Sequence, residues 1–469
     1  MDAITPKLAQ FAAKTRFEDL PDSVVLEAKL VLLDCIGCAL AGLETSKGKL
    51  SVQLARRLAG PLESTVIGVG GKVAAANAAF ANGELINALD YDVGATPPGH
   101  SSPCVIPAGL ALAEAVGASG RELIAAIAIG HEISARLGAV LSDLIEYPES
   151  GPVLSPVHGY SMHAFGAAAS GARVLKLDGE RMGWALGIAG YNAPVPAMIK
   201  FCKTTPLAMT KYASTGWISH VGVSAALLAE MGYTGDSTVL DGDYGFWRYT
   251  ASDREKWDPQ KVIDGLGKQW HFDRPSVFYK QYPACGLFLT ELDELRKIMD
   301  ENQLAPEEVE SVKIFSAMPL YYQEAWTNQD IRSNIDAQFS VAYNVAASAY
   351  QVKLTDWQAE STLTDPRIKR FMAKVSVETN PDVTVSLEIL ARGKVFINKK
   401  RQQIEDKTSV DQSQEHGMTT AQIVAKFKDN ASKLLTATNI ECATQTILQL
   451  ETLDNVSDLT TAIVHQDVN

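Results

Sequence analysis

The spacing of apolar residues changes twice along this chain, and each change marks a different kind of structure. Up to about residue 265, apolar residues recur at helical spacing in Ala-, Gly- and Leu-rich segments such as IPAGLALAEAVGASGRELIAAIAIGHEISARLG. Past about residue 270, the runs VESVKIFSA and KVSVETNPDVTVSLEILARGKVFIN alternate and are rich in β-branched residues, which predicts strands. After about residue 405 the helical spacing returns.

These three regions predict a mostly α protein with a smaller α+β domain. A chain of 469 residues exceeds what one hydrophobic core usually supports. We therefore expect a large all-helical domain over residues 1–266 and an α+β domain over residues 267–405, where DAQFSVAYNVAASAYQ forms a helix between strands. Residues 406–469 either form a separate bundle or, as we prefer, pack back onto the helical domain and complete it.

Charge and apolar content exclude several classes of partner. The net charge of −13 disfavours binding to nucleic acid or to an anionic membrane surface, because both would repel the chain. No segment has 18 consecutive apolar residues, and the N-terminus MDAITPKLAQFAAKTRFEDLPDS lacks the pattern of a secretory signal. Six cysteines are too few for a disulfide scaffold. We expect a cytoplasmic protein, with a small anionic substrate still possible in a local basic pocket.

The sequence predicts neither a metal nor another cofactor. Cys35 and Cys38 form a C-x-x-C inside VVLEAKLVLLDCIGCALAG, which is typical of a buried helix, so core packing is favoured over redox or zinc chemistry. Of the eight histidines only His158 and His163 are close together, and their spacing of five does not place two ligands on one helical face. No phosphate-binding G-x-x-x-x-G-K loop occurs. Any catalysis is expected to use side chains alone.

One polar turn interrupts the apolar helical segments. The stretch NALDYDVGATPPGHSSPCVIPA, residues 87–108, carries Asp90, Asp92 and His100 around glycines and prolines. A structural explanation exists for each, since Asp90 can neutralise a helix end and His100 can occupy a surface turn. Abstraction of a proton next to a carboxylate or imine needs a base, cations that hold substrate carboxylates, and donors for the enolate-like charge. The turn supplies candidates for the base and its partners.

Several motifs, taken in order, give the chain a resemblance to a known family. They are LLDCIGCALAG, ALDYD followed by HSSPCVIPA, HAFGAAAS, MGWALGIAG, MTKYASTG, VLDGDYGF and KQYPACG. In this order they resemble the MmgE/PrpD family, which includes 2-methylcitrate dehydratases, cis-aconitate decarboxylases and an iminodisuccinate epimerase. The resemblance implies a helical domain built from both chain ends, an α+β lid, an active site in the cleft between them, no metal, and a homodimer.

The resemblance also assigns roles to residues at the matching positions. The catalytic positions it implies are Asp90, His100, His158 and Lys211, and the substrate-binding positions are Lys280 and Tyr343 on the lid. We expect Asp90 to orient His100 and favour its protonated form, with His158 or Lys211 as the second proton-exchanging group. Asp92 is expected to orient a neighbour.

Other positions carry weaker expectations. Lys203, with Lys200, is a further candidate for contact with a substrate carboxylate. His163 is expected to be an interior histidine. Without the ordered motifs, the lysines would be interpreted as solvated, His158 as an interior residue and Tyr343 as core.

Departures from the motifs bear on which reaction the chain catalyses. Ser214 stands where family members commonly carry a histidine, GLFLTELD lacks a second one, and Gly94 replaces a frequent threonine. Fewer polar groups remain to expel a hydroxide, which argues against a 2-methylcitrate dehydratase. We predict a cofactor-independent proton-transfer enzyme acting on a small di- or tricarboxylate, preferably an epimerase of an iminodisuccinate-like dicarboxylate. The alternatives are a dehydratase, a cis-aconitate-type decarboxylase and, from another class, a non-catalytic carboxylate-binding protein.

Overall fold

Helices dominate the computed structural model of this chain. It describes residues 3–95, 99–141, 144–250, 258, 260–274, 276–379, 385–399 and 417–464. The first half contains α1 (Ile4–Lys14), α2 (Asp22–Gly42), α3 (Ser46–Leu58), α4 (Ala75–Ile86), α5 (Ser102–Ala115), α6 (Gly120–Leu141), α7 (His163–Val174), α8 (Gly179–Tyr191), α9 (Met198–Cys202), α10 (Thr215–Glu230), α11 (Trp247–Thr250) and α12 (Gln260–Ile263). The helical periodicity of this region is thereby confirmed.

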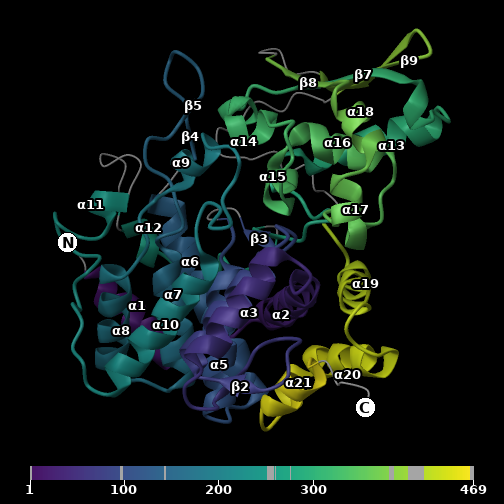
Figure 1. Cartoon of the computed structure of the whole chain (residues 1–469). Coiled ribbons are helices and arrows are strands. Elements are labelled where there is room, and N and C mark those ends of the chain that lie inside the picture. The colour runs from purple at the N-terminus through teal and green to yellow at the C-terminus, as the bar shows by residue number, and fades with distance from the viewer. Residues whose placement is uncertain are drawn as a thin grey trace.

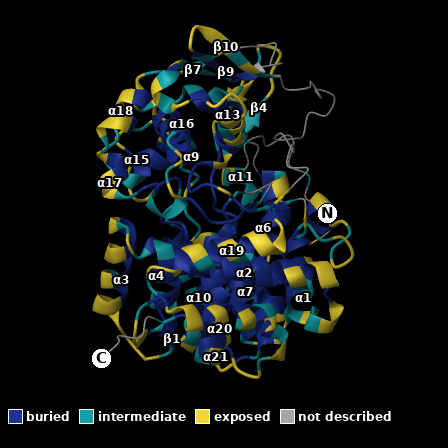
Figure 2. Ribbon diagram, turned by 90° about the vertical axis from the view of Figure 1, so that its right-hand side faces the viewer, coloured by how far each residue is buried: buried dark blue, intermediate teal, exposed yellow. Residues whose placement is uncertain are grey.

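Small side chains let the central helices approach closely. Helix α7, HAFGAAASGARV, is buried along almost its whole length and contacts α5, α6 and α10. Its alanines and glycines leave little side-chain volume between helix axes, so neighbouring backbones pack directly against each other. Figure 2 shows this buried interior surrounded by helices with exposed outer faces. These closely packed helices support the turn that follows α4.

Helix α6 is the one described helix that is long and apolar enough to cross a membrane. Of its most apolar 18-residue window, 89% is buried inside the protein. It begins after Ser119, whose hydroxyl accepts from the Glu122 backbone N–H while the Glu122 carboxylate accepts from the Ser119 N–H. The burial identifies α6 as a core helix.

The α+β region is built on a four-stranded sheet with the order β10-β9-β7-β8. Strands β7 (Val309–Phe315) and β8 (Val375–Glu378) are parallel, while β9 (Val385–Ala391) is antiparallel to β7 and to β10 (Lys394–Lys399). The accompanying helices are α13 (Leu289–Glu301), α14 (Glu324–Thr327), α15 (Asn334–Phe339), α16 (Val341–Ala349), α17 (Glu360–Leu363) and α18 (Pro366–Met372). The predicted helix over 336–351 is interrupted at Ser340, whose hydroxyl accepts from the Tyr343 N–H and caps α16.

The C-terminal helices return to the beginning of the chain. They are α19 (Thr420–Ala431), α20 (Ala437–Leu448) and α21 (Ser457–Ala462), shown in yellow in Figure 1. Helices α19 and α20 pack on α2, and the Lys29 ammonium of α2 binds Glu451 at 3.0 Å and the Leu448 carbonyl at 3.0 Å. The predicted boundary near residue 405 lies outside the described residues. Cys35 and Cys38 are buried in α2, as expected of core residues.

Three two-stranded ribbons contain the remaining strands of the described residues. Strand β1 (Ser64–Thr65) pairs with β2 (Lys72–Val73), and β4 (Ile145–Glu146) pairs with β5 (Val153–Leu154). Strand β3 (Gly94–Ala95) pairs with β6 (Val277–Phe278), which joins two segments far apart in the sequence. This last ribbon positions the candidate site.

Candidate active site

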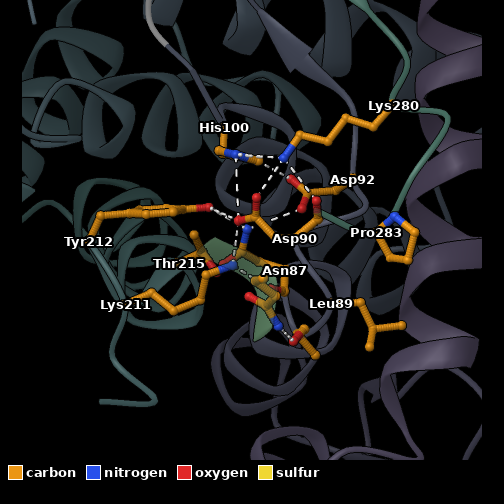
Figure 3. Close-up of polar contacts among 12 residues, drawn as sticks. Asn87, Leu89, Asp90, Asp92, His100, Lys211, Tyr212, Thr215, Lys280 and Pro283 are labelled. Carbon is orange, nitrogen blue, oxygen red and sulfur yellow. Dashed lines mark hydrogen bonds and ion pairs between the residues drawn. The ribbon is translucent and has the colours of Figure 1, made fainter. Parts of the chain in front are cut away.

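A buried carboxylate lies at the centre of the candidate site. Asp90 follows α4 and adopts φ 54°, a left-handed conformation that is uncommon for residues other than glycine. One oxygen, Oδ1, accepts from Lys211 Nζ at 2.6 Å and from the Tyr212 hydroxyl at 2.9 Å, and the other accepts from Lys280 Nζ at 2.6 Å. Figure 3 shows the two lysines converging on Asp90 from opposite sides. Backbone strain of this kind persists where surrounding contacts hold the residue in place, often at functional sites.

Lys211 is held in a second strained turn. Its φ is 52°, and its ammonium also donates to the Asn87 carbonyl at 3.0 Å. The following residues are fastened to α4, because Glu84 Oε1 accepts from the Ser214 hydroxyl at 2.5 Å and from the Gly216 N–H at 2.9 Å. The chain thus uses Ser214 to fix the start of α10.

Lys280 reaches the site through the ribbon formed by β3 and β6. Gly94 pairs with Phe278, and a Cβ at Gly94 would lie 2.4 Å from the Phe278 ring, so glycine is required for this close approach. Two residues beyond Phe278, the Lys280 ammonium donates to the Asp90 carbonyl at 2.8 Å as well as to its carboxylate. The ribbon therefore carries a lysine from the second half of the chain to the turn of the first half.

His100 is bound to Asp92 rather than to Asp90. Its Nδ1 lies 2.6 Å from Asp92 Oδ2, whereas its Nε2 lies 3.8 Å from Asp90 Oδ1 and 3.4 Å from Lys280 Nζ. The orienting contact that we expected from Asp90 is thus made by Asp92. An ammonium can only donate, so beside a protonated Lys280 the His100 Nε2 is the acceptor and Nδ1 carries the ring proton.

The whole cluster is removed from solvent, and its charges offset one another. Burial alone would raise the pKa of Asp90, but Lys211, Lys280 and His100 together hold that pKa well below its usual value. Burial would also raise the pKa of Asp92, but His100 and Lys280 together hold that pKa below its usual value. Burial lowers the pKa of Lys211 to about 8 despite the opposing effect of Asp90. Lys211 can therefore gain or lose a proton near neutral pH.

His158 lies beside the cluster without joining its hydrogen bonds. The Tyr160 ring is a neighbour of both histidines, with centroids 6.3 Å from His158 and 6.4 Å from His100. His158 is 8% exposed, its Nδ1 has no partner among the described residues, and burial lowers its pKa to about 4. It is a neutral imidazole at pH 7. His163 stacks on Tyr160 and is buried, as expected of an interior histidine.

The structure does not bring Tyr343 or Lys203 into the cluster. The Tyr343 side chain is fully buried on α16, and its hydroxyl donates to the Trp357 carbonyl within the α+β region. Lys203 follows α9 and is exposed, and so is Lys200, which donates to Thr204. The position of a residue in a motif does not fix where its side chain points, because one step along a helix turns a side chain to a different face.

Two members of the cluster escaped the sequence analysis. The Asn87 amide donates to Asp92 Oδ1 at 3.1 Å and to the Tyr212 hydroxyl at 2.8 Å, which links both aspartates. Tyr212 also stacks on His100, with ring centroids 5.3 Å apart and planes 19° apart. Asn87 is the first residue of the stretch 87–108, and Tyr212 directly follows Lys211. Their closeness in sequence to predicted site residues was the signal that could have identified them. No group of His, Cys, Asp and Glu suited to a metal occurs among the residues that the structure describes.

Comparisons with known proteins find matches along almost the whole chain. Residues 6–259 match the MmgE/PrpD N-terminal domain, and residues 282–452 match the MmgE/PrpD C-terminal domain. The cis-aconitate decarboxylase of Homo sapiens is 26% identical over 475 residues, covering 99% of this chain and 95% of the relative. That of Aspergillus terreus is also 26% identical, with 97% and 95% covered, and that of Mus musculus is 25% identical, with 98% and 93% covered.

These relatives change which of the predicted reactions is favoured. All three are named as decarboxylases, so they favour the decarboxylase alternative and give no specific support to the epimerase. They also favour an enzyme over a non-catalytic binding protein.

Proposed function

Because this chain belongs to the MmgE/PrpD family and is an enzyme of its lyase or isomerase type, we propose that it decarboxylates a small unsaturated tricarboxylate of the cis-aconitate class. The observation that carries this proposal is the pair of buried ammonium groups on Asp90. Two cations at 2.6 Å from one carboxylate form a site that can exchange an internal carboxylate for substrate carboxylates. A nearby imidazole supplies the proton-transfer group that decarboxylation needs.

The bond changes can be written for cis-aconitate itself. The bond between the CH2 carbon and its carboxylate breaks, CO2 leaves, and the electron pair forms a new double bond to the central carbon. The former double-bond electrons move onto the CH carbon, where the adjacent carboxylate stabilises them as an enolate-like charge. A proton then joins that carbon, which gives an itaconate-like product. Lys211 and Lys280 stabilise the developing charge, and His100 Nε2, oriented by Asp92, receives a proton from the Lys280 ammonium and passes it to that carbon.

An epimerase of a dicarboxylate is the second candidate. It requires two groups that exchange protons on opposite faces of one carbon. His100 Nε2 and Lys211 Nζ approach Asp90 Oδ1 at 3.8 Å and 2.6 Å, and the pKa of Lys211 is about 8. This pair favours the second candidate over a dehydratase.

Proton NMR in deuterated water separates these reactions. The enzyme is incubated with cis-aconitate, iminodisuccinate, 2-methylcitrate and citrate in separate samples. We expect terminal vinyl signals from cis-aconitate, with deuterium at the former CH carbon and release of CO2. Exchange at an α carbon with a changed diastereomer ratio and no CO2 would instead establish the epimerase, and vinyl signals from 2-methylcitrate or citrate would establish a dehydratase.

The rate is expected to depend on pH through Lys211. Below pH 8 its ammonium is charged and holds a substrate carboxylate, and above its pKa of about 8 the charge is lost. We therefore predict that kcat/KM for cis-aconitate falls as pH rises through about 8. In Lys211→Arg the guanidinium stays protonated, so the fall should move to higher pH even if the maximum rate is lower. A fall at the same pH in both proteins would contradict this assignment.

The remaining expectations concern organisation. We propose, from the family's organisation, that residues 267–405 act as a lid that brings Lys280 to the site, and that the enzyme is a cytoplasmic homodimer without a cofactor. Its partners are then a small anionic carboxylate and a second copy of the chain.

A further inference from the structure

A second buried ion pair lies directly behind the candidate site. Asp34, in the middle of α2, and Lys426, on α19, are joined by a contact of 2.7 Å between Oδ1 and Nζ. Their side chains are 0% and 3% exposed. Removing two charges from water is costly, and such a pair is often no more stabilising than apolar residues of the same size. Its presence therefore calls for a reason other than stability.

The pair contacts the two peptide groups that flank Asp92. Asp34 Oδ2 accepts from the Val93 N–H at 3.1 Å, and Lys426 Nζ donates to the Tyr91 carbonyl at 2.7 Å. The Lys426 ammonium also lies 3.9 Å from the centroid of the Tyr91 ring. The peptide on each side of Asp92 is thus fixed by one member of the pair.

Asp92 is the residue that orients His100, through the contact of 2.6 Å to Nδ1. A shift of its backbone would move the His100 ring relative to Asp90 and Lys280. Positional errors of about 1 Å at a reacting group can lower a rate by about 10²-fold. Contacts that fix the two peptides therefore also fix the position of the His100 ring.

We infer that Asp34 and Lys426 are positioning residues, which hold Asp92 and, through Asp92, the His100 imidazole in place for proton transfer. The catalytic consequence rests on the proposed function, whereas the effect on His100 does not. Because Lys426 belongs to α19, the C-terminal part of the chain completes the active site without touching the substrate.

A neighbouring ion pair provides a matched control. Lys29 and Glu451 also join α2 to the C-terminal region, at 3.0 Å, and their side chains are 10% and 32% exposed. Lys29 donates to the Leu448 carbonyl and to Glu451, and it makes no hydrogen bond to the described residues of the turn, 90–95 and 99–100. Loss of this pair weakens the attachment of the C-terminal helices without releasing Asp92.

The test compares Asp34→Leu/Lys426→Met with Lys29→Met/Glu451→Leu in the full-length protein. Both double variants remove a pair without leaving a lone charge. Three quantities are measured: the denaturation midpoint, kcat and KM for cis-aconitate, and the Nδ1–H proton resonance of His100 in protein labelled with 15N-histidine. The resonance is assigned by its absence in His100→Asn.

We expect the Asp34/Lys426 variant to shift or lose the His100 resonance and to lower kcat roughly 10- to 100-fold, with KM changed less than about threefold. The Lys29/Glu451 variant should keep the resonance and keep kcat within about twofold of the wild type. Equal resonance and equal kcat in the two folded variants would overturn the inference.

If the Asp34→Leu/Lys426→Met variant does not fold, Asp34→Asn/Lys426→Gln takes its place, because amides keep the polarity of the pair but not the ammonium contact to Tyr91. A His100 resonance identical to that of the wild type would then overturn the inference. The His100 resonance is measured without substrate, so it tests the positioning role of Asp34 and Lys426 even if cis-aconitate is not turned over. Absence of turnover would count against the proposed function alone.

Discussion

Replacing Asp90 with asparagine is expected to lower the free energy of unfolding by about 3–5 kcal/mol, because it leaves two buried ammonium groups without their counter-charge. Lys211 and Lys280 are 0% and 1% exposed at their side chains, so water cannot take over the role of the carboxylate. Turnover should fall as well, since the strained turn loses the contacts that hold it. Chemical denaturation at pH 7 measures the stability change directly.

The matched control for this variant is Asp19→Asn. Asp19 pairs with Arg16 at the surface, where the Asp19 side chain is 44% exposed and water screens the pair, so its loss should destabilise the protein far less than the loss of Asp90. Since the pKa of Asp90 is held well below its usual value, its stabilising contribution is complete above about pH 4 and is lost as pH falls through the folded-state pKa. The difference between Asp90→Asn and wild type should therefore shrink in acid. Equal costs for the two variants at pH 7 would contradict the ion-pair account.

Replacing His100 with asparagine is expected to lower kcat by roughly 10²- to 10⁴-fold, the usual contribution of a general acid or base. Asparagine can keep a donor near the position of Nδ1, so Asp92 retains a partner, while the Nε2 that faces Lys280 is removed. Thermal unfolding should change little, and KM should change less than kcat.

His220→Asn serves as the control for the histidine substitution. His220 lies on α10, is partly buried and contacts Ser224 and Trp217 rather than the cluster. Its replacement should leave kcat within about twofold of the wild-type value. If His100→Asn were as active as His220→Asn, the proton-transfer role of His100 would be wrong.

Much of this architecture is predictable from local patterns. Helical spacing over the first half and β-branched alternation near residues 309–315 and 385–399 predict the elements found there, because burial on one face imposes a period on the sequence. Asp90, Asp92 and His100 are close in sequence, so their shared turn was also predictable.

Other contacts depend on long-range packing that no local pattern records. Strands β3 and β6 have two residues each, too few for a periodic signal, yet they bring Lys280 to Asp90. His100 binds Asp92, and Asp90 adopts a left-handed conformation that its residue type does not predict. Tyr343 lies on α16, outside the cluster, and the break at Ser340 where α16 begins is likewise not predicted by the helical pattern.

The most direct test of the central claim is the release of labelled CO2. Wild-type enzyme and His100→Asn are each supplied with cis-aconitate carrying 13C in the carboxylate of its CH2 arm, and 13CO2 and the organic product are quantified together. The account predicts one 13CO2 for each unlabelled itaconate-like molecule from the wild type, and a rate roughly 10²- to 10⁴-fold lower from the variant. Intact labelled substrate after prolonged incubation with folded wild-type enzyme, or equal CO2 release by both proteins, would contradict it.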